Sequence, residues 1–175
     1  MSRSFVLEHV PALRRYARVL TGDAWAADDL VQDTLERACD KWSLWRPGTD
    51  LRAWLFTLMH NLYLNQRRGA AARAVLVPID ELQADLAAPA AERDAAIDLQ
   101  RCLQQLPDDQ RAALLLVALE DLPYADAARV LGVPPGTLMS RLSRARARLR
   151  ELMDAPARAD LAPAAGAPPA LRRLK

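Results

Sequence analysis

Five arginines and no acidic residue lie between Pro135 and Arg150. Threonine and serine residues stand near the start of the same segment. Guanidinium groups can donate paired hydrogen bonds to guanine edges and can neutralise phosphates, and short polar residues near a helix N-terminus suit the major groove. The segment therefore predicts a helix that reads duplex DNA. The alternative is a basic amphipathic helix that binds an acidic protein or a membrane surface.

The turn before this segment favours DNA binding. A helix-turn-helix needs a small residue where its helices cross and a turn residue that tolerates positive φ. Ala128 and Gly132 meet these needs. Apolar anchors flank the turn at Leu131, Val133 and Leu138. An apolar stripe follows along the second helix at steps of four and three: Leu138, Leu142, Ala145, Leu149 and Leu152. We expect helices at about 124–131 and 135–153.

Residues 51–68 mix aromatic side chains with asparagine and arginine outside a stripe of leucines. Rings can stack on unpaired bases while cations hold phosphates, which suits single-stranded nucleic acid. The alternative is that Trp54 and Phe56 belong to the core of a helical bundle. For each aromatic residue taken singly, this alternative is favoured over a role in nucleic-acid binding. Polar residues of the segment are harder to place in a core, namely Arg52, Asn61, Arg67 and Arg68.

A helix predicted at about 24–42 carries an acidic face. Its apolar side chains recur at steps of four and three, which predicts one buried side: Ala27, Val31, Leu35, Ala38 and Trp42. Another side holds Asp29, Gln32, Asp33, Glu36 and Asp40. Such a face is more often solvated than used to dock a protein.

The sequence shows no recognisable catalytic motif. It contains no glycine-rich phosphate loop, no histidine-centred triad and no cluster of inward carboxylates. Cys39, Cys102, His9 and His60 lack the spacing of zinc ligands, and the histidines are expected to be packing or surface residues. We expect a protein that is not an enzyme and has no cofactor, no metal site and no small-molecule substrate.

Composition and charge suggest how the chain is organised. In 175 residues, 51% are apolar and only six are glycine, which favours a helical protein. Basic and acidic side chains number 10 and 8 in residues 1–68, 4 and 10 in residues 69–122, and 10 and 4 in residues 123–175, so the net charge runs +2, −6, +6. The basic C-terminal third indicates a local anionic partner, unless its arginines are only solvated.

We therefore predict an all-α fold of two small helical domains joined by a flexible linker, the second with the helix-turn-helix. The predicted divisions are a first domain at 1–68, a linker at 69–91, a second domain at 92–154 and a disordered tail at 155–175. No apolar run approaches the roughly 20 residues that cross a membrane, and the N-terminus lacks a signal pattern. A cytoplasmic protein without membrane insertion is the expectation.

Three stretches, in this order, resemble the extracytoplasmic-function (ECF) sigma factors of the sigma-70 family. They are Asp-Asp-Leu-Val-Gln-Asp-Thr-Leu-Glu-Arg-Ala at 28–38, Leu-Arg-Ala-Trp-Leu-Phe-Thr at 51–57 followed by Asn61, and the helix-turn-helix through 140–148. Leu-Pro-Asp-Asp-Gln-Arg at 106–111 matches as well. The likeness covers most of residues 5–153.

The resemblance implies a transcription initiation factor that binds core RNA polymerase and promoter DNA. The residues that it places on the polymerase are Asp29, Gln32, Asp33 and Glu36. The residues that it places on the −10 element are Trp45, Arg52, Trp54, Asn61, Tyr63, Asn65, Arg67 and Arg68. The residues that it places on the −35 element are Pro135, Thr137, Ser140, Arg141, Ser143, Arg144 and Arg148.

The resemblance also implies an anti-sigma factor as partner and a linker that passes through the polymerase's active-site and RNA-exit region. Three positions depart from the common pattern. Met139 stands where many relatives have arginine or lysine, His60 where arginine is common, and Asn65 where an acid is frequent. These departures concern promoter choice more than the class of protein.

Two other functions stay open at this point. One is a sigma-like decoy that binds an anti-sigma factor without reading DNA. The other is a stand-alone helix-turn-helix regulator, which should bind operator DNA tightly by itself, typically as a dimer. For a sigma factor we expect weak binding of the free chain to DNA, because a flexible linker would leave two small domains uncoupled.

Overall fold

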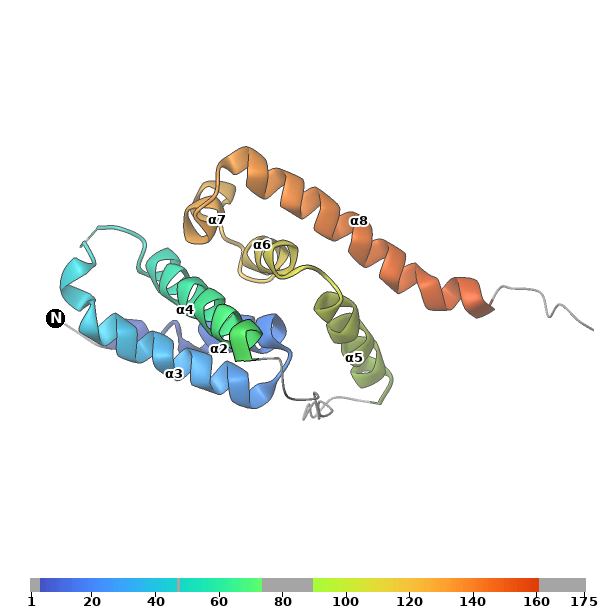
Figure 1. Cartoon of the computed structure of the whole chain (residues 1–175), viewed down its shortest axis with the longest axis horizontal. Coiled ribbons are helices and arrows are strands. Elements are labelled where there is room, and N and C mark those ends of the chain that lie inside the picture. Colours follow the sequence, from blue (N-terminus) through green and yellow to red (C-terminus); the bar gives the residue numbers. More distant parts are fainter. Residues whose placement is uncertain (1–3, 47, 74–89, 161–175) are drawn as a thin grey trace, which may run out of the picture.

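The computed structural model describes residues 4–46, 48–73 and 90–160. In these residues helices are joined by turns and loops and no strand occurs, which confirms the all-α prediction (Figure 1). The elements are α1 (Ser4–Leu7), α2 (Val10–Thr21), α3 (Ala24–Asp40), the 3-10 helix η1 (Trp42–Leu44), α4 (Leu51–Arg73), α5 (Ala90–Gln104), α6 (Asp108–Ala118), α7 (Tyr124–Leu131) and α8 (Pro135–Asp160). We call α1–α4 the first half and α5–α8 the second half.

Local residue chemistry accounts for where these helices begin and end. The Asp23 carboxylate accepts a hydrogen bond from the Ala26 amide and caps α3, and Asp50 caps α4 through the amides of Arg52 and Ala53. Gly132 ends α7 with a φ of 63°. This left-handed conformation is the one that the helix-turn-helix turn requires of a glycine.

Helices α2, α3 and α4 pack together around a shared core in the first half. Tyr16 of α2 and Phe56 of α4 meet edge to face at its centre, with ring centroids 5.2 Å apart. In the second half, α6 packs against α7 and α8. Leu138, Leu142 and Ala145 of α8 are buried there, so the apolar stripe predicted for this helix does face the core.

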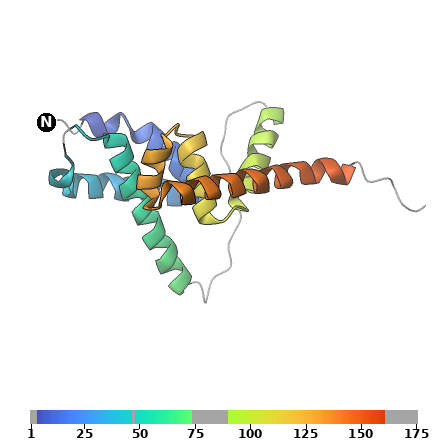
Figure 2. The same cartoon turned by 90° about the horizontal axis from the view of Figure 1, so that it is seen from above.

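The two halves lie against each other, which differs from the expected uncoupled domains. Helix α4 packs on α7, and α2 packs on α5 and α6. Figure 1 shows α6 and α7 between the first half and α8, and Figure 2 shows the C-terminal end of α8 projecting past the other helices. The periodicity of each helix marks a buried side, but it does not say which half supplies the neighbour.

Two helices run further than predicted. Helix α4 continues from 68 to Arg73, and α8 continues from 153 to Asp160, so the predicted disorder of the tail is wrong for 155–160. Alanine-rich composition suggested a tail there, yet alanine has the highest helix propensity of all residues. The rest of the predicted linker and tail, 74–89 and 161–175, lies outside the described residues.

The described helices include none long and apolar enough to cross a membrane. Within the same residues, no three His, Cys, Asp or Glu side chains gather where they could hold a metal ion.

We predict different effects of alanine on stability at two glycines of the helix-turn-helix. A Cβ would meet no atom within 4 Å at either Gly132 or Gly136, but only Gly132 has positive φ. Gly132→Ala should lower the free energy of unfolding by about 1–2 kcal/mol, whereas Gly136→Ala should leave it unchanged or raise it by up to about 1 kcal/mol. Urea denaturation measures both, and equal effects would contradict this account of the turn.

Candidate nucleic-acid interface

Helix α8 presents an exposed polar face opposite its buried stripe. Pro135, Ser143 and Arg144 are exposed, while Thr137 and Ser140 are half-buried. The Arg144 guanidinium lies back along the helix, where Nε donates to the Ser140 carbonyl at 3.2 Å and Nη2 to the Ser140 Oγ at 3.1 Å. These contacts are local to one exposed turn, so they leave Arg144 accessible to a partner.

The two other arginines predicted to contact −35 DNA have acidic partners. Arg141 is 23% exposed, and its Nε lies 3.1 Å from Oδ2 of Asp109 in α6. Arg148 lies along α8 with Nη1 3.0 Å from Oε2 of Glu151. An exposed pair of this kind contributes little to stability, so Arg148 stays available. Arg141 is less exposed than Arg148, and its partner lies on another helix.

Part of the predicted −10 surface is formed by tryptophans at the start of α4 and the loop before it. The ring centroid of Trp42 lies 5.3 Å from that of Trp45 and 6.2 Å from that of Trp54. All three side chains are half-buried. Further along α4, the predicted contacts Asn61, Asn65 and Arg68 are exposed. Phe56, by contrast, belongs to the core.

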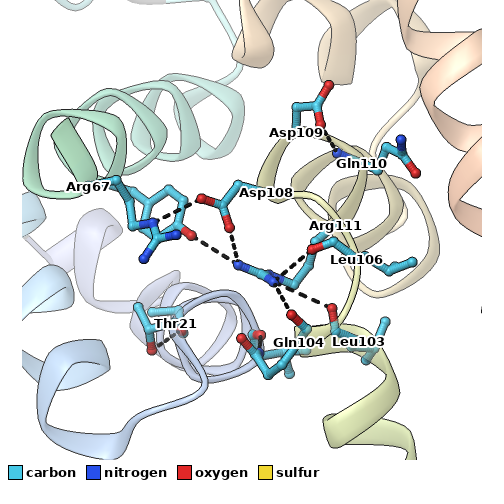
Figure 3. A network of polar contacts seen from close by, with 12 residues as sticks. Thr21, Arg67, Leu103, Gln104, Leu106, Asp108, Asp109, Gln110 and Arg111 are labelled. Carbon is cyan, nitrogen blue, oxygen red and sulfur yellow. Dashed lines mark hydrogen bonds and ion pairs between the residues drawn. The ribbon is translucent and has the colours of Figure 1, made fainter. Parts of the chain in front are cut away.

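Three other predicted −10 residues point at the second half. Arg52 Nη2 lies 2.8 Å from Oε2 of Glu120. The Tyr63 hydroxyl accepts a hydrogen bond from Arg111 at 3.1 Å, and burial raises the pKa of this hydroxyl. Arg67 Nε lies 2.9 Å from Oδ2 of Asp108 (Figure 3). In this conformation these side chains serve as contacts between the halves.

Glu120 is the centre of these contacts and was missed by sequence reasoning. Only 1% of the residue is exposed. Arg15 donates to both of its oxygens, Nε to Oε1 at 2.9 Å and Nη2 to Oε2 at 2.8 Å, beside the bond from Arg52. Both arginines come from the first half, and their charges and hydrogen bonds offset the cost of taking the carboxylate out of water. The sequence carries no local signal for this role, because the partners lie 105 and 68 positions away.

A second polar cluster joins the halves beside α6 (Figure 3). Arg111 is buried and donates to Asp108 as well as to Tyr63. Its Nη1 also donates to the carbonyls of Gln104 and Leu106, each at 3.2 Å. Gln104 in turn donates through Nε2 to the carbonyl of Val19 in α2 at 2.7 Å. Arg111 therefore organises the turn between α5 and α6 against the first half.

The acidic face of α3 is free of the second half. We call Asp29, Gln32, Asp33 and Glu36 the acidic stripe; all four are exposed. Gln32 donates to Glu36 at 3.1 Å, and Gln66 donates to Asp33 at 3.0 Å. Within the described residues these carboxylates have no arginine or lysine partner, whereas neighbouring Asp28 pairs with Arg14 and Arg18. The stripe is an unneutralised negative surface.

Comparison with known proteins assigns the family. Family models match residues 6–60, described as the Sigma2 domain of PhyR, and residues 96–149, described as sigma-70 region 4. The ECF RNA polymerase sigma factor EcfG of Rhodopseudomonas palustris is 38% identical over 86% of this chain and 84% of its own length. The chain belongs to the ECF sigma factors. A Mycobacterium tuberculosis relative, ECF RNA polymerase sigma factor SigM, is 36% identical over 83% of this chain and 73% of its own.

Two solved structures share the fold of this ECF sigma factor. The sigma factor RpoE from Bartonella quintana, in complex with the anti-sigma factor NepR, is 34% identical with a TM-score of 0.74, covering 87% of this chain and 98% of that one. CnrH in complex with the cytosolic domain of CnrY is 29% identical with a TM-score of 0.65, covering 87% and 86%.

His60 of this sigma factor lies in the packed zone of α4, not at its surface. The residue is 5% exposed, and its Nδ1 has no hydrogen-bond partner among the described residues. Burial, with a smaller contribution from the nearby charge of Arg141, lowers the pKa of the imidazole to about 4. His60 is therefore a neutral packing residue near neutral pH.

The pKa of His60 predicts loss of stability in mild acid. The unfolded chain takes up the proton near its ordinary pKa of 6.5 and the folded chain only near 4, so between these values the unfolded state binds more protons. Stability should be unaffected above pH 6.5 and should fall by up to about 3 kcal/mol as the pH drops to 4. Urea denaturation across this range, compared with His60→Gln, isolates the effect. Parallel pH profiles for the two proteins would contradict it.

Proposed function

We propose that this ECF sigma factor directs RNA polymerase to −35 and −10 promoter elements and helps to open the duplex. The observation that carries the proposal is the exposed cationic face of α8 on a helix-turn-helix, in a chain that also carries the acidic stripe on a separate half. One surface suits DNA and the other suits a basic protein surface, as a specificity subunit of polymerase needs. Its role is that of a DNA-binding regulator without catalytic chemistry of its own.

Helix α8 would read the −35 element in the major groove. Arg144 and Ser143 stand on its exposed face, with Ser140 beside them, where side chains can reach base edges. Arg148, one turn further on, suits a phosphate contact. Arg141 would have to leave Asp109 to join them, so its contribution is expected to be smaller. Pro135 and Thr137 lie at the N-terminus of the same helix.

The first half would hold the melted −10 element. Trp45 and Trp54 supply ring faces for unpaired bases, and Asn61, Asn65 and Arg68 supply exposed polar contacts. The remaining three contacts that we assign to this element, Arg52, Tyr63 and Arg67, engage the second half in this conformation. Their use on DNA therefore requires the halves to separate.

The acidic stripe would dock on core RNA polymerase. In one structure compared above, the sigma factor RpoE from Bartonella quintana is in complex with the anti-sigma factor NepR. We extend this to the present chain and propose an anti-sigma factor as a regulatory partner. A decoy that binds only an anti-sigma factor would not need the accessible Arg144 face, and a stand-alone regulator would not need the acidic stripe.

Promoter-selective run-off transcription with core polymerase tests the function. Arg144→Ala should reduce initiation at −35-dependent promoters, with a loss of about 1–3 kcal/mol if the arginine makes a bidentate base contact. Arg101→Ala, an exposed arginine on α5, should leave the transcript yield unchanged. Wild-type holoenzyme that is no more selective than core enzyme would refute the proposal, and tight operator binding without polymerase would favour a stand-alone regulator.

A further inference from the structure

Trp25 is an unusually exposed side chain at the start of α3. It is 84% exposed, more than any other large apolar side chain in the described residues. A lone exposed apolar residue needs no explanation. Tryptophan on a helix face that is otherwise charged is different, because its ring is kept in water at a cost in free energy.

The position of Trp25 relative to the acidic stripe is what gives it meaning. Residues 25, 29, 32 and 36 follow one another at steps of four, three and four, so at about 100° per residue they lie within roughly 40° of Trp25 around the helix. The buried residues of α3 occupy the opposite side: Ala27, Leu30, Val31, Thr34 and Ala38. Trp25 therefore lies on the acidic stripe, one turn N-terminal to Asp29.

We propose that Trp25 is the apolar anchor of the surface that docks core RNA polymerase, an inference that rests on the proposed function. The occupant is a basic surface of polymerase with an apolar pocket or an arginine to receive the indole. Three carboxylates without cationic partners supply charge complementarity, and the ring can stack on a guanidinium. Tryptophan is also the residue type most enriched among those that dominate binding energy.

The test measures the affinity of the full chain for core polymerase. Trp25→Ala should weaken binding about tenfold or more, as expected for an anchor, and Trp25→Phe should recover part of the loss. Leu7→Ala is the matched control, because Leu7 is a large apolar residue of the same half that is 64% exposed and lies off the stripe. It should bind as the wild type does.

Asp33→Ala separates this inference from the proposed function. If Asp33→Ala weakens binding and Trp25→Ala does not, the anchor is wrong and the docking surface stands. If Asp33→Ala binds normally, the docking part of the proposed function fails. Equal losses of polymerase affinity for Trp25→Ala and Leu7→Ala would overturn the anchor. It would also be overturned if Trp25→Ala bound polymerase normally but lost self-association.

Discussion

One buried carboxylate, that of Glu120, links the two halves of this sigma factor. A carboxylate removed from water is unfavourable unless it is paired and hydrogen-bonded, and the pairing here comes from Arg15 and Arg52 on the other half. The burial of the Glu120 side chain and the closed arrangement of the two halves therefore go together. Arg111, buried beside Tyr63 and Asp108, adds a second polar contact of the same kind.

This dependence divides the functional surfaces into accessible and covered ones. The exposed face of α8 around Arg144 and the acidic stripe of α3 are open to partners in the closed arrangement, whereas Arg52, Tyr63 and Arg67 are engaged. Under the proposed function, the surface suited to melted DNA would be complete only once the halves have moved apart, whereas the surfaces suited to duplex DNA and to a basic protein are already accessible.

Local features were predictable wherever a short stretch of chain decides the outcome. Asp50 caps α4 and Gly132 ends α7, because capping and positive φ depend on a few adjacent residues. The prediction of disorder was wrong for residues 155–160, because an alanine-rich composition is compatible with both a helix and a disordered tail. Phe56 proved to be core and His60 proved to be packed, yet neither outcome could be separated from a binding role by spacing alone.

The sequence by itself determined the helices, their buried sides, the basic face of α8, the acidic stripe and the family, because periodicity and motif order are properties of neighbouring residues. Only the tertiary structure decided which charged side chains form ion pairs within the protein. Arg52 and Arg144 read alike in the sequence, but Arg52 meets a buried carboxylate 68 positions away and Arg144 stays at the surface. Such pairing depends on how one half is placed on the other, and no local pattern encodes that placement.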